Sequence, residues 1–259
     1  MDVIKKKVSQ YNFMFTELVK RDFNKRYKRS ILGILWSMVA PMFQLIVMSF
    51  VFDRVFGETM QYYTVYMFAG QLVFNYFREA TDNGMQSIIA NAGIITKVNA
   101  PKYLFLISKV MAASINFLLI LVIFFMFVAY YKIPFTWKFI LIIIPIACLF
   151  VLIIGTGLIL SALFVFFKDI QYLYDIFTLA LMYFSAIFYN VSIFKDSIVG
   201  KLIYLNPVFL YINYIREIVI SAKIPSLNYN LYCVFYALVM LRIGMYMYKK
   251  YNYMFLYYI

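Results

Sequence analysis

The sequence predicts an all-α, polytopic membrane protein, and two observations carry this prediction. Of the 259 residues, 65% are hydrophobic and 14% are charged, with a mean hydropathy of +0.84. A water-soluble domain of this length could not cover such a composition with polar surface. In addition, apolar stretches long enough to cross a bilayer recur along the chain, separated by short charged segments. We therefore expect one transmembrane domain over residues 1–259, with six spans.

The N-terminal segment, residues 1–30, changes from basic to apolar within a few residues. Tyr11–Arg29 carries apolar residues at spacings of three and four and basic residues between them, a pattern typical of a helix in the membrane interface. The interface residues that we single out are Arg21, Arg26, Tyr27 and Arg29. Basic residues before the first span indicate a cytosolic N-terminus. The alternative is a basic flank without helical order.

Residues 31–194 are expected to hold the first five spans. These are Ile31–Phe52, a helix from Tyr62 with a polar inner end, Leu104–Tyr131, Phe139–Phe167 and Tyr172–Phe194. A neighbouring helix can satisfy the carbonyl that Pro41 frees in the first span. Small residues allow helices to approach closely in lipid, so the group Gly155, Thr156 and Gly157 indicates packing.

The inner end of the second span carries the charges Arg78, Glu79 and Asp82. Charged side chains inside a membrane protein usually face the bundle interior or a water-filled cavity. We therefore predict a polar cavity at these three residues. Arg78 and Asp82 stand one helical turn apart and can form an ion pair. Lys109, near the inner end of the third span, can reach the interface by snorkelling.

Residues 195–230 should lie outside the cell, because five spans precede them. Asn206 and Pro207 form a cap followed by proline at the first helical position. The helix that follows is too short to cross a bilayer, so we expect a re-entrant or interfacial helix. Leu231–Tyr248 is the sixth span, and residues 249–259 form a cytosolic tail.

The composition excludes several kinds of chemistry. The chain has no histidine, no phosphate-binding loop of the Walker type and no cysteine cluster, so we expect no catalytic residue, no metal site and no cofactor. Cys148 and Cys233 lie in apolar runs and are expected to be buried thiols rather than a disulfide. The net charge of +13 fits lipid headgroups and the positive-inside bias better than nucleic acid. A conduit or a partner-driven transporter remains.

Four segments in the same order resemble ABC transporter permease subunits that export polysaccharides, O-antigens and teichoic acids. They are RYKRSILGILWSMVAP (26–41), NAGIITKVNAPK (91–102), GLILSALFVFFKDIQYL (157–173) and LNPVFLYINYIRE (205–217). Two positions depart from that family: Lys168 stands where it usually has Arg, and Ala186 follows Ser185 where it tends to have Pro. The second departure leaves the helix geometry near Ser185 open.

The resemblance implies a homodimer in the bacterial cytoplasmic membrane with both termini in the cytosol. Two copies of a separate ATPase subunit would bind ATP and Mg²⁺, and an undecaprenyl-linked glycan would be the substrate. The ATPase would dock on the loop of Lys97, Val98, Asn99, Ala100, Pro101 and Lys102. The resemblance also assigns an extracellular gate to the short helix, at Asn206, Pro207, Arg216 and Glu217.

Aromatic side chains can stack on sugar rings while a glycan slides past them. The candidates for such a conduit are Trp36, Tyr76, Phe77, Tyr183, Phe184 and Tyr189. Two other functions stay open. One is an ABC permease for a lipid or drug-like amphiphile. The other is a membrane enzyme or scaffold of cell-wall assembly, for which Glu79 and Asp82 would be the acid–base pair.

Overall fold

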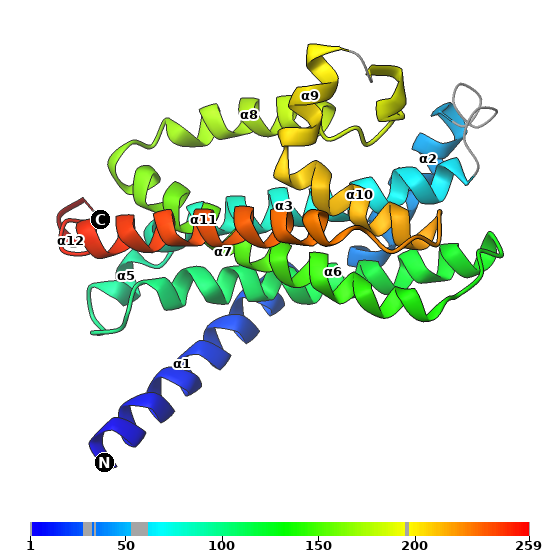
Figure 1. Cartoon of the computed structure of the whole chain (residues 1–259). Helices are drawn as coiled ribbons and strands as arrows, with labels where there is room; N and C mark the ends of the chain where they lie inside the picture. Colours follow the sequence, from blue (N-terminus) through cyan, green and yellow to red (C-terminus); the bar gives the residue numbers. More distant parts are fainter. Residues whose placement is uncertain (1, 28–32, 34, 53–61, 195–196, 259) are drawn as a thin grey trace.

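The computed structural model describes residues 2–27, 33, 35–52, 62–194 and 197–258. These residues form helices joined by turns, so the chain is an all-α membrane protein (Figure 1). The helices are α1 (Asp2–Tyr27), α2 (Leu35–Phe52), α3 (Tyr63–Met85), α4 (Ser87–Ala90), α5 (Ala92–Ile95), α6 (Tyr103–Tyr130), η2 (Trp137–Ile142), α7 (Ile143–Phe166), α8 (Ile170–Phe184), η3 (Val191–Phe194), α9 (Ile198–Leu205), α10 (Pro207–Val219), α11 (Leu227–Tyr251) and α12 (Phe255–Tyr258).

Three long elements of this part of the chain have the length and hydropathy of membrane spans: α6, η2 with α7, and α11. The bent pair α9 and α10 makes a fourth if it is one broken span, and Met38–Met48 and Ile170–Phe184 are shorter apolar helical stretches. The charges at the end of α3 keep it from counting as an apolar span, although it is one continuous helix as expected. The number of six spans stays a prediction.

The core is centred on α3, which packs against α6, α7 and α10. Its buried residues include Phe68, Phe74 and Met67, and Phe68 meets Phe124 of α6 edge to face at 5.4 Å. Figure 1 shows α3, α6, α7 and α11 running side by side, whereas α1 leaves the bundle obliquely and α8 lies apart from it. One end of the bundle holds α5 and α12, and we call it the α5 end. The opposite end holds the turn between α6 and η2, and α9 stands beside the bundle between the two ends.

The N-terminal helix lies against α6, and it starts earlier than expected, at Asp2. Leu18 is buried and Phe15 half-buried, while Phe13 is exposed, so the predicted apolar stripe is the face that packs. Lys109 of α6, predicted to reach the interface, contacts α1. Its Nζ lies 3.3 Å from Oδ1 of Asp22, because the packing of α1 on α6 brings this carboxylate beside it.

The helix expected over Tyr172–Phe194 ends at Phe184, well before its predicted end. Ser185 follows in a turn, and Ala186 has a φ of 46°, in the left-handed region that residues other than glycine rarely adopt. The chain continues through η3 into α9. The position that departs from the family pattern is therefore the position at which the helix breaks.

A close helix contact joins α7 and α11 through glycines. A Cβ atom added to Gly155 would lie 2.4 Å from the backbone N of Leu241, and one added to Gly244 would lie 2.6 Å from the carbonyl O of Gly155. The two backbones therefore touch where neither residue has a side chain. The predicted packing role of the small residues Gly155–Gly157 is confirmed.

We expect Gly155→Ala to destabilise the folded protein by about 1–3 kcal/mol, because the added methyl group overlaps the α11 backbone. The measurement is the unfolding midpoint of the purified protein in detergent. Gly93→Ala is the matched control, since a Cβ there meets nothing within 4 Å. Equal midpoints for both variants would contradict this account of the contact.

Candidate functional site

A polar groove runs along α3 through an otherwise apolar bundle. One hollow of about 490 Å³ is walled by α2, α3, α6 and α8, and a second of about 480 Å³ lies between α1, α3 and α6. Both are lined by Glu79 and Asp82. We use the name polar groove for these two hollows together. Their volumes lie in the range of pockets that hold small ligands, roughly 300–1,000 Å³.

The groove follows from the helical period of α3. Asn75, Arg78, Glu79, Asp82 and Asn83 recur at spacings of three and four and are exposed or half-buried, whereas most other residues of α3 are buried. The helix therefore turns its apolar faces to α6, α7 and α10 and leaves one polar stripe open. The structure places the three residues predicted for a polar cavity, Arg78, Glu79 and Asp82, in the lining of one hollow.

Hydrogen bonds across the groove hold some of its polar groups in place. Asn116 Nδ2 donates to Glu79 Oε2 over 3.3 Å, and Gln86 Nε2 donates to Asp82 Oδ1 over 3.2 Å. Asp82 thus bonds Gln86, the residue that follows α3, rather than forming the expected ion pair with Arg78. Carboxylate and amide oxygens accept hydrogen bonds, so the groove suits a ligand rich in hydroxyl groups.

Several lining residues escaped the sequence reasoning. They are Gln44 of α2, Asn116 and Ile120 of α6, and Tyr174 and Asp175 of α8. A signal was present for most of them, since Gln44, Asn116 and Asp175 are polar residues within apolar runs. Tyr174 also bonds Thr81 of α3 through its hydroxyl group. Within the described residues, no group of acidic or cysteine side chains could hold a metal ion.

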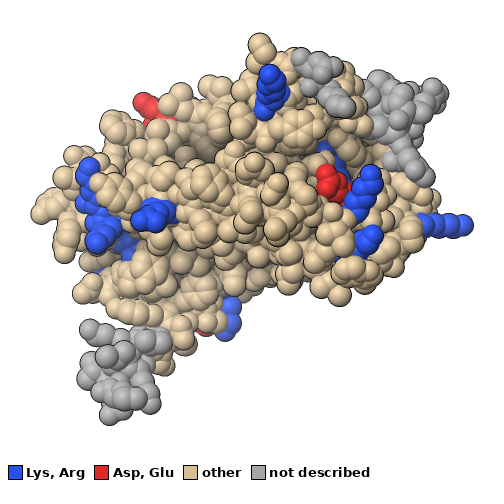
Figure 2. Space-filling view, in the orientation of Figure 1, with Lys and Arg blue, Asp and Glu red and all other residues tan. Residues whose placement is uncertain are grey.

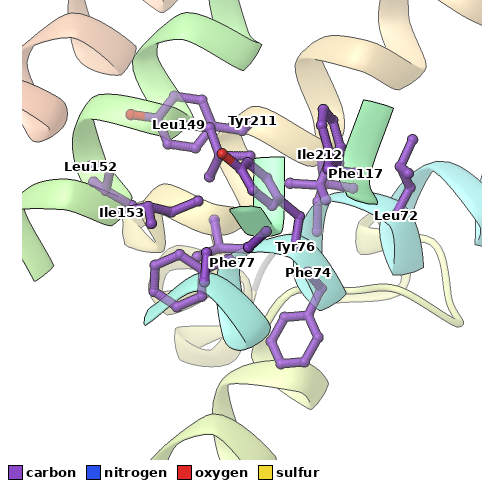
Figure 3. Close-up of a cluster of buried hydrophobic side chains, with 14 of the residues drawn as sticks. Leu72, Phe74, Tyr76, Phe77, Phe117, Leu149, Leu152, Ile153, Tyr211 and Ile212 are labelled. Carbon is purple, nitrogen blue, oxygen red and sulfur yellow. The ribbon is translucent and has the colours of Figure 1, made fainter. Parts of the chain in front are cut away.

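The six aromatic residues predicted for a conduit do not lie along one path. Trp36 is 49% exposed and lines the hollow beside α8. Tyr76 and Phe77 are buried, and Figure 3 shows them among Phe117, Leu149 and other core side chains. Tyr183 and Phe184 end α8 with exposed rings, and the hydroxyl group of Tyr189 donates to the Tyr183 carbonyl over 2.6 Å. Only Trp36 among the six has an exposed ring in the polar groove.

The interface helix joins the bundle through Arg21. Its Nη2 donates to Asp22 Oδ1 over 2.8 Å and to Asn91 Oδ1 over 2.7 Å, so it connects α1 with the turn between α4 and α5. Arg26 and Tyr27 are the last residues of α1. Arg29, the fourth predicted interface residue, lies outside the described residues.

The 97–102 loop projects from the α5 end. Lys97, Val98 and Asn99 are exposed, and Ala100 and Pro101 are half-buried. Lys102 differs, since only 8% of it is exposed and its Nζ donates to the Asn252 carbonyl. Burial lowers the pKa of the Lys102 amine. Figure 2 shows Lys and Arg side chains at this end of the molecule and also at the opposite end.

The segment predicted as a gate forms the bent helix pair α9 and α10. The side chain of Asn206 accepts a hydrogen bond from Val208 N over 2.9 Å, and Pro207 occupies the first turn of α10, so the predicted cap is confirmed. The axes of α9 and α10 meet at 84°. Glu217 stays half-buried and accepts a hydrogen bond from Asn213.

Arg216 of α10 lies in the interior and binds three backbone carbonyls. Its Nε donates to Tyr66 O over 3.0 Å, its Nη1 to Ala186 O over 2.9 Å and its Nη2 to Ile187 O over 3.0 Å. The guanidinium also stacks 3.4 Å from the centre of the Tyr66 ring. A Cβ on Gly70 would lie 2.7 Å from Nη2, so this glycine makes room for the side chain. Arg216 thus ties α10 to α3 and to the break after α8.

Comparison with known proteins places these features in a family. The family model described as ABC-2 type transporter matches residues 14–220. The O-antigen export system permease protein RfbA of Klebsiella pneumoniae is 27% identical over 255 residues, which cover 95% of this chain and 96% of the relative. A protein of the same name from Myxococcus xanthus is 25% identical over 219 residues and 84% of each chain.

We expect Arg216→Ala to destabilise the protein by about 2 kcal/mol or more, because three buried carbonyls lose their donor. Arg216→Lys should destabilise the protein less than Arg216→Ala does, since an ammonium group can reach some but not all of the three carbonyls. Unfolding midpoints in detergent measure both effects. Lys201→Ala, which removes an exposed cation from α9, serves as the control. An unchanged midpoint for Arg216→Ala would contradict the role assigned to this side chain.

Proposed function

The chain belongs to the ABC-2 type transporter family, and we propose that it is the membrane-spanning subunit of an ATP-driven exporter of a lipid-linked surface polysaccharide. The observation that carries this proposal is the polar groove through the apolar bundle. Carboxylates and amides at membrane depth are energetically costly, and a chain that only anchors a partner does not need them. A transporter needs such groups to form hydrogen bonds with a polar substrate that crosses the membrane.

The chemistry of the groove favours a carbohydrate. Asp82, Asp175 and Glu79 offer carboxylates to sugar hydroxyl groups, and Asn75 and Gln44 offer amides. Trp36 presents a half-exposed ring at the same hollow, against which a sugar ring can stack. The relatives named as O-antigen export permeases support the same substrate class for this chain. An undecaprenyl carrier would hold the glycan at the membrane.

Energy for transport must come from a second protein under this proposal, because the sequence has no phosphate-binding loop. Two copies of an ATPase subunit with bound ATP and Mg²⁺ would work on a dimer of this chain. The exposed part of the 97–102 loop is the element that we assign to the ATPase. A transport cycle needs such an element to make different contacts in each nucleotide state.

The proposal fixes an orientation in the bacterial cytoplasmic membrane. The α5 end, with the 97–102 loop and α12, would face the cytosol together with both termini. The opposite end, with the turn between α6 and η2, would then lie outside, and α9 and α10 would form the gate on that side. The basic residues Lys97, Lys249 and Lys250, exposed at the α5 end, agree with the positive-inside rule.

A second candidate function is supported by an apolar hollow on the other side of Tyr174. This hollow measures about 460 Å³ and is walled by apolar side chains of α3, α7, α8, α10 and α11, among them Phe77, Leu181 and Met240. Tyr174 lines both this hollow and the polar groove. An amphiphile without a long glycan, such as a lipid, could occupy such a pair of sites.

Trp36→Ala should lower polysaccharide export about threefold to tenfold, a tenfold loss corresponding to ~1.4 kcal/mol. The measurement is the polysaccharide at the surface of cells whose only copy of the permease is the variant. Trp137→Ala is the matched control, because Trp137 is 66% exposed on η2, away from the groove. Unchanged export with Trp36→Ala, together with a lipid that copurifies and moves, would favour the amphiphile instead.

The permease should copurify with a phosphate-loop ATPase as a two-plus-two complex, and Val98→Asp should weaken that complex without loss of membrane insertion. Val98 is 45% exposed in the loop, so a carboxylate there alters the contact rather than the fold. The mass of the intact complex in mild detergent is the measurement. Val199→Asp makes the same exchange at an exposed site of α9 and should leave the complex intact. Recovery of the permease alone would contradict the proposal.

A further inference from the structure

Lys102 differs from its neighbours in the 97–102 loop by facing inward. Its Nζ donates to the carbonyl of Asn252, and the same nitrogen lies 5.4 Å from the centre of the Phe255 ring. Both partners belong to the end of the chain, 150 residues further along the sequence. An ammonium group buried in this way is a poor contact for another protein, because little of it is accessible from outside.

Phe255 is part of an aromatic cluster that reaches into the bundle. It is fully buried, and its ring centre lies 5.3 Å from that of Tyr248 on α11 and 6.0 Å from that of Phe166 on α7. The hydroxyl group of Tyr248 bonds Ser161 Oγ at 2.8 Å. The turn around Phe255 is thus fixed to α7 and α11, which contact each other through glycines.

The exposed part of the loop has little else to hold it. Between Lys97 and Pro101, the backbone hydrogen bonds among the described residues run to Ile94 of α5, within the loop, or from Leu104 to Pro101. Side chains therefore attach this part of the chain to the bundle. They are the buried Ile95 of α5, the half-buried Ala100, which packs against the core, and Lys102.

We propose that Phe255 and Lys102 form a brace that holds the 97–102 loop in the position in which it meets the ATPase. Lys102 is then a positioning residue, and Val98 and its exposed neighbours make the contact. The identity of the partner rests on the proposed function, whereas the brace rests only on the contacts of Lys102 and Phe255. Without it, the loop samples several positions, and the apparent affinity for the partner falls by the fraction of molecules that remain correctly placed.

The first measurement concerns the permease alone. A nitroxide label is attached to Val98→Cys after Cys148 and Cys233 have been replaced by alanine, and its mobility is recorded by electron paramagnetic resonance. Phe255→Ala and Lys102→Met should each make the label more mobile. Tyr257→Ala should not, because Tyr257 is 88% exposed and lies two residues from Phe255 on the same short helix. Equal mobility in all variants overturns the brace.

The second measurement is the affinity of the isolated ATPase for the detergent-purified permease with its native Val98. Phe255→Ala should weaken binding about tenfold if a tenth of the loops stay in place. Lys102→Arg should retain most of the affinity, since a guanidinium can donate to the same carbonyl and lie over the same ring. The double variant Lys102→Met, Phe255→Ala should bind the ATPase no more weakly than the weaker of the two single variants. Both substitutions remove the same interaction, that between Lys102 and Phe255.

The outcomes separate the two proposals. If Val98→Asp leaves ATPase binding unchanged, the assigned contact is wrong, and the label still decides whether the brace exists. If Phe255→Ala makes the label more mobile while the affinity for the ATPase stays at the wild-type value, the positioning role is overturned. An equal loss of affinity with Tyr257→Ala also overturns it, since the tail would then touch the partner directly. Lys102→Met carries the test if Phe255→Ala does not fold.

Discussion

The turn that ends α8 depends on one side chain, Arg216. Backbone carbonyls inside a membrane protein must find donors within the protein, because hydrocarbon offers none. The turn at Ser185–Ala186 frees the carbonyls of Ala186 and Ile187, and Arg216 bonds both of them. Its third bond, to Tyr66, fixes α10 to the start of α3. The left-handed turn, the bend before α10 and the open space at Gly70 therefore belong to one arrangement around a buried cation.

The polar groove and the core are two faces of the same helix. Because α3 is surrounded on most sides, its apolar residues hold α6, α7 and α10 together, and the stripe from Asn75 to Asn83 can remain polar at little cost to packing. A polar site at membrane depth is easier to maintain on such a helix than on a peripheral one. The proposed conduit would thus be lined by a helix most of whose residues are buried.

The sequence was sufficient for the fold class, the helix positions and the cap at Asn206–Pro207, because hydropathy, helical period and turn residues are local signals. The charged cavity residues also followed from their unusual depth. The sequence did not predict which way the rings of Tyr76 and Phe77 face. Apolar residues surround both on every side of the helix, so the pattern does not indicate which side is buried. The partners of Lys109, Lys102 and Arg216 lie far away in sequence, so only the three-dimensional structure could reveal these contacts. The end of the helix at Phe184 depends on the contact of Arg216.

The glycine contact between α7 and α11 has a consequence for the order of assembly. Synthesis proceeds from the N-terminus, so α8 follows α7 directly and becomes available to it before α11 does. Backbones that meet at Gly155 and Gly244 approach more closely than side chains elsewhere allow. The later helix therefore takes the position beside α7, and the earlier one is left at the periphery with its apolar residues uncovered. The neighbours in the finished bundle are set by fit rather than by the sequence of insertion.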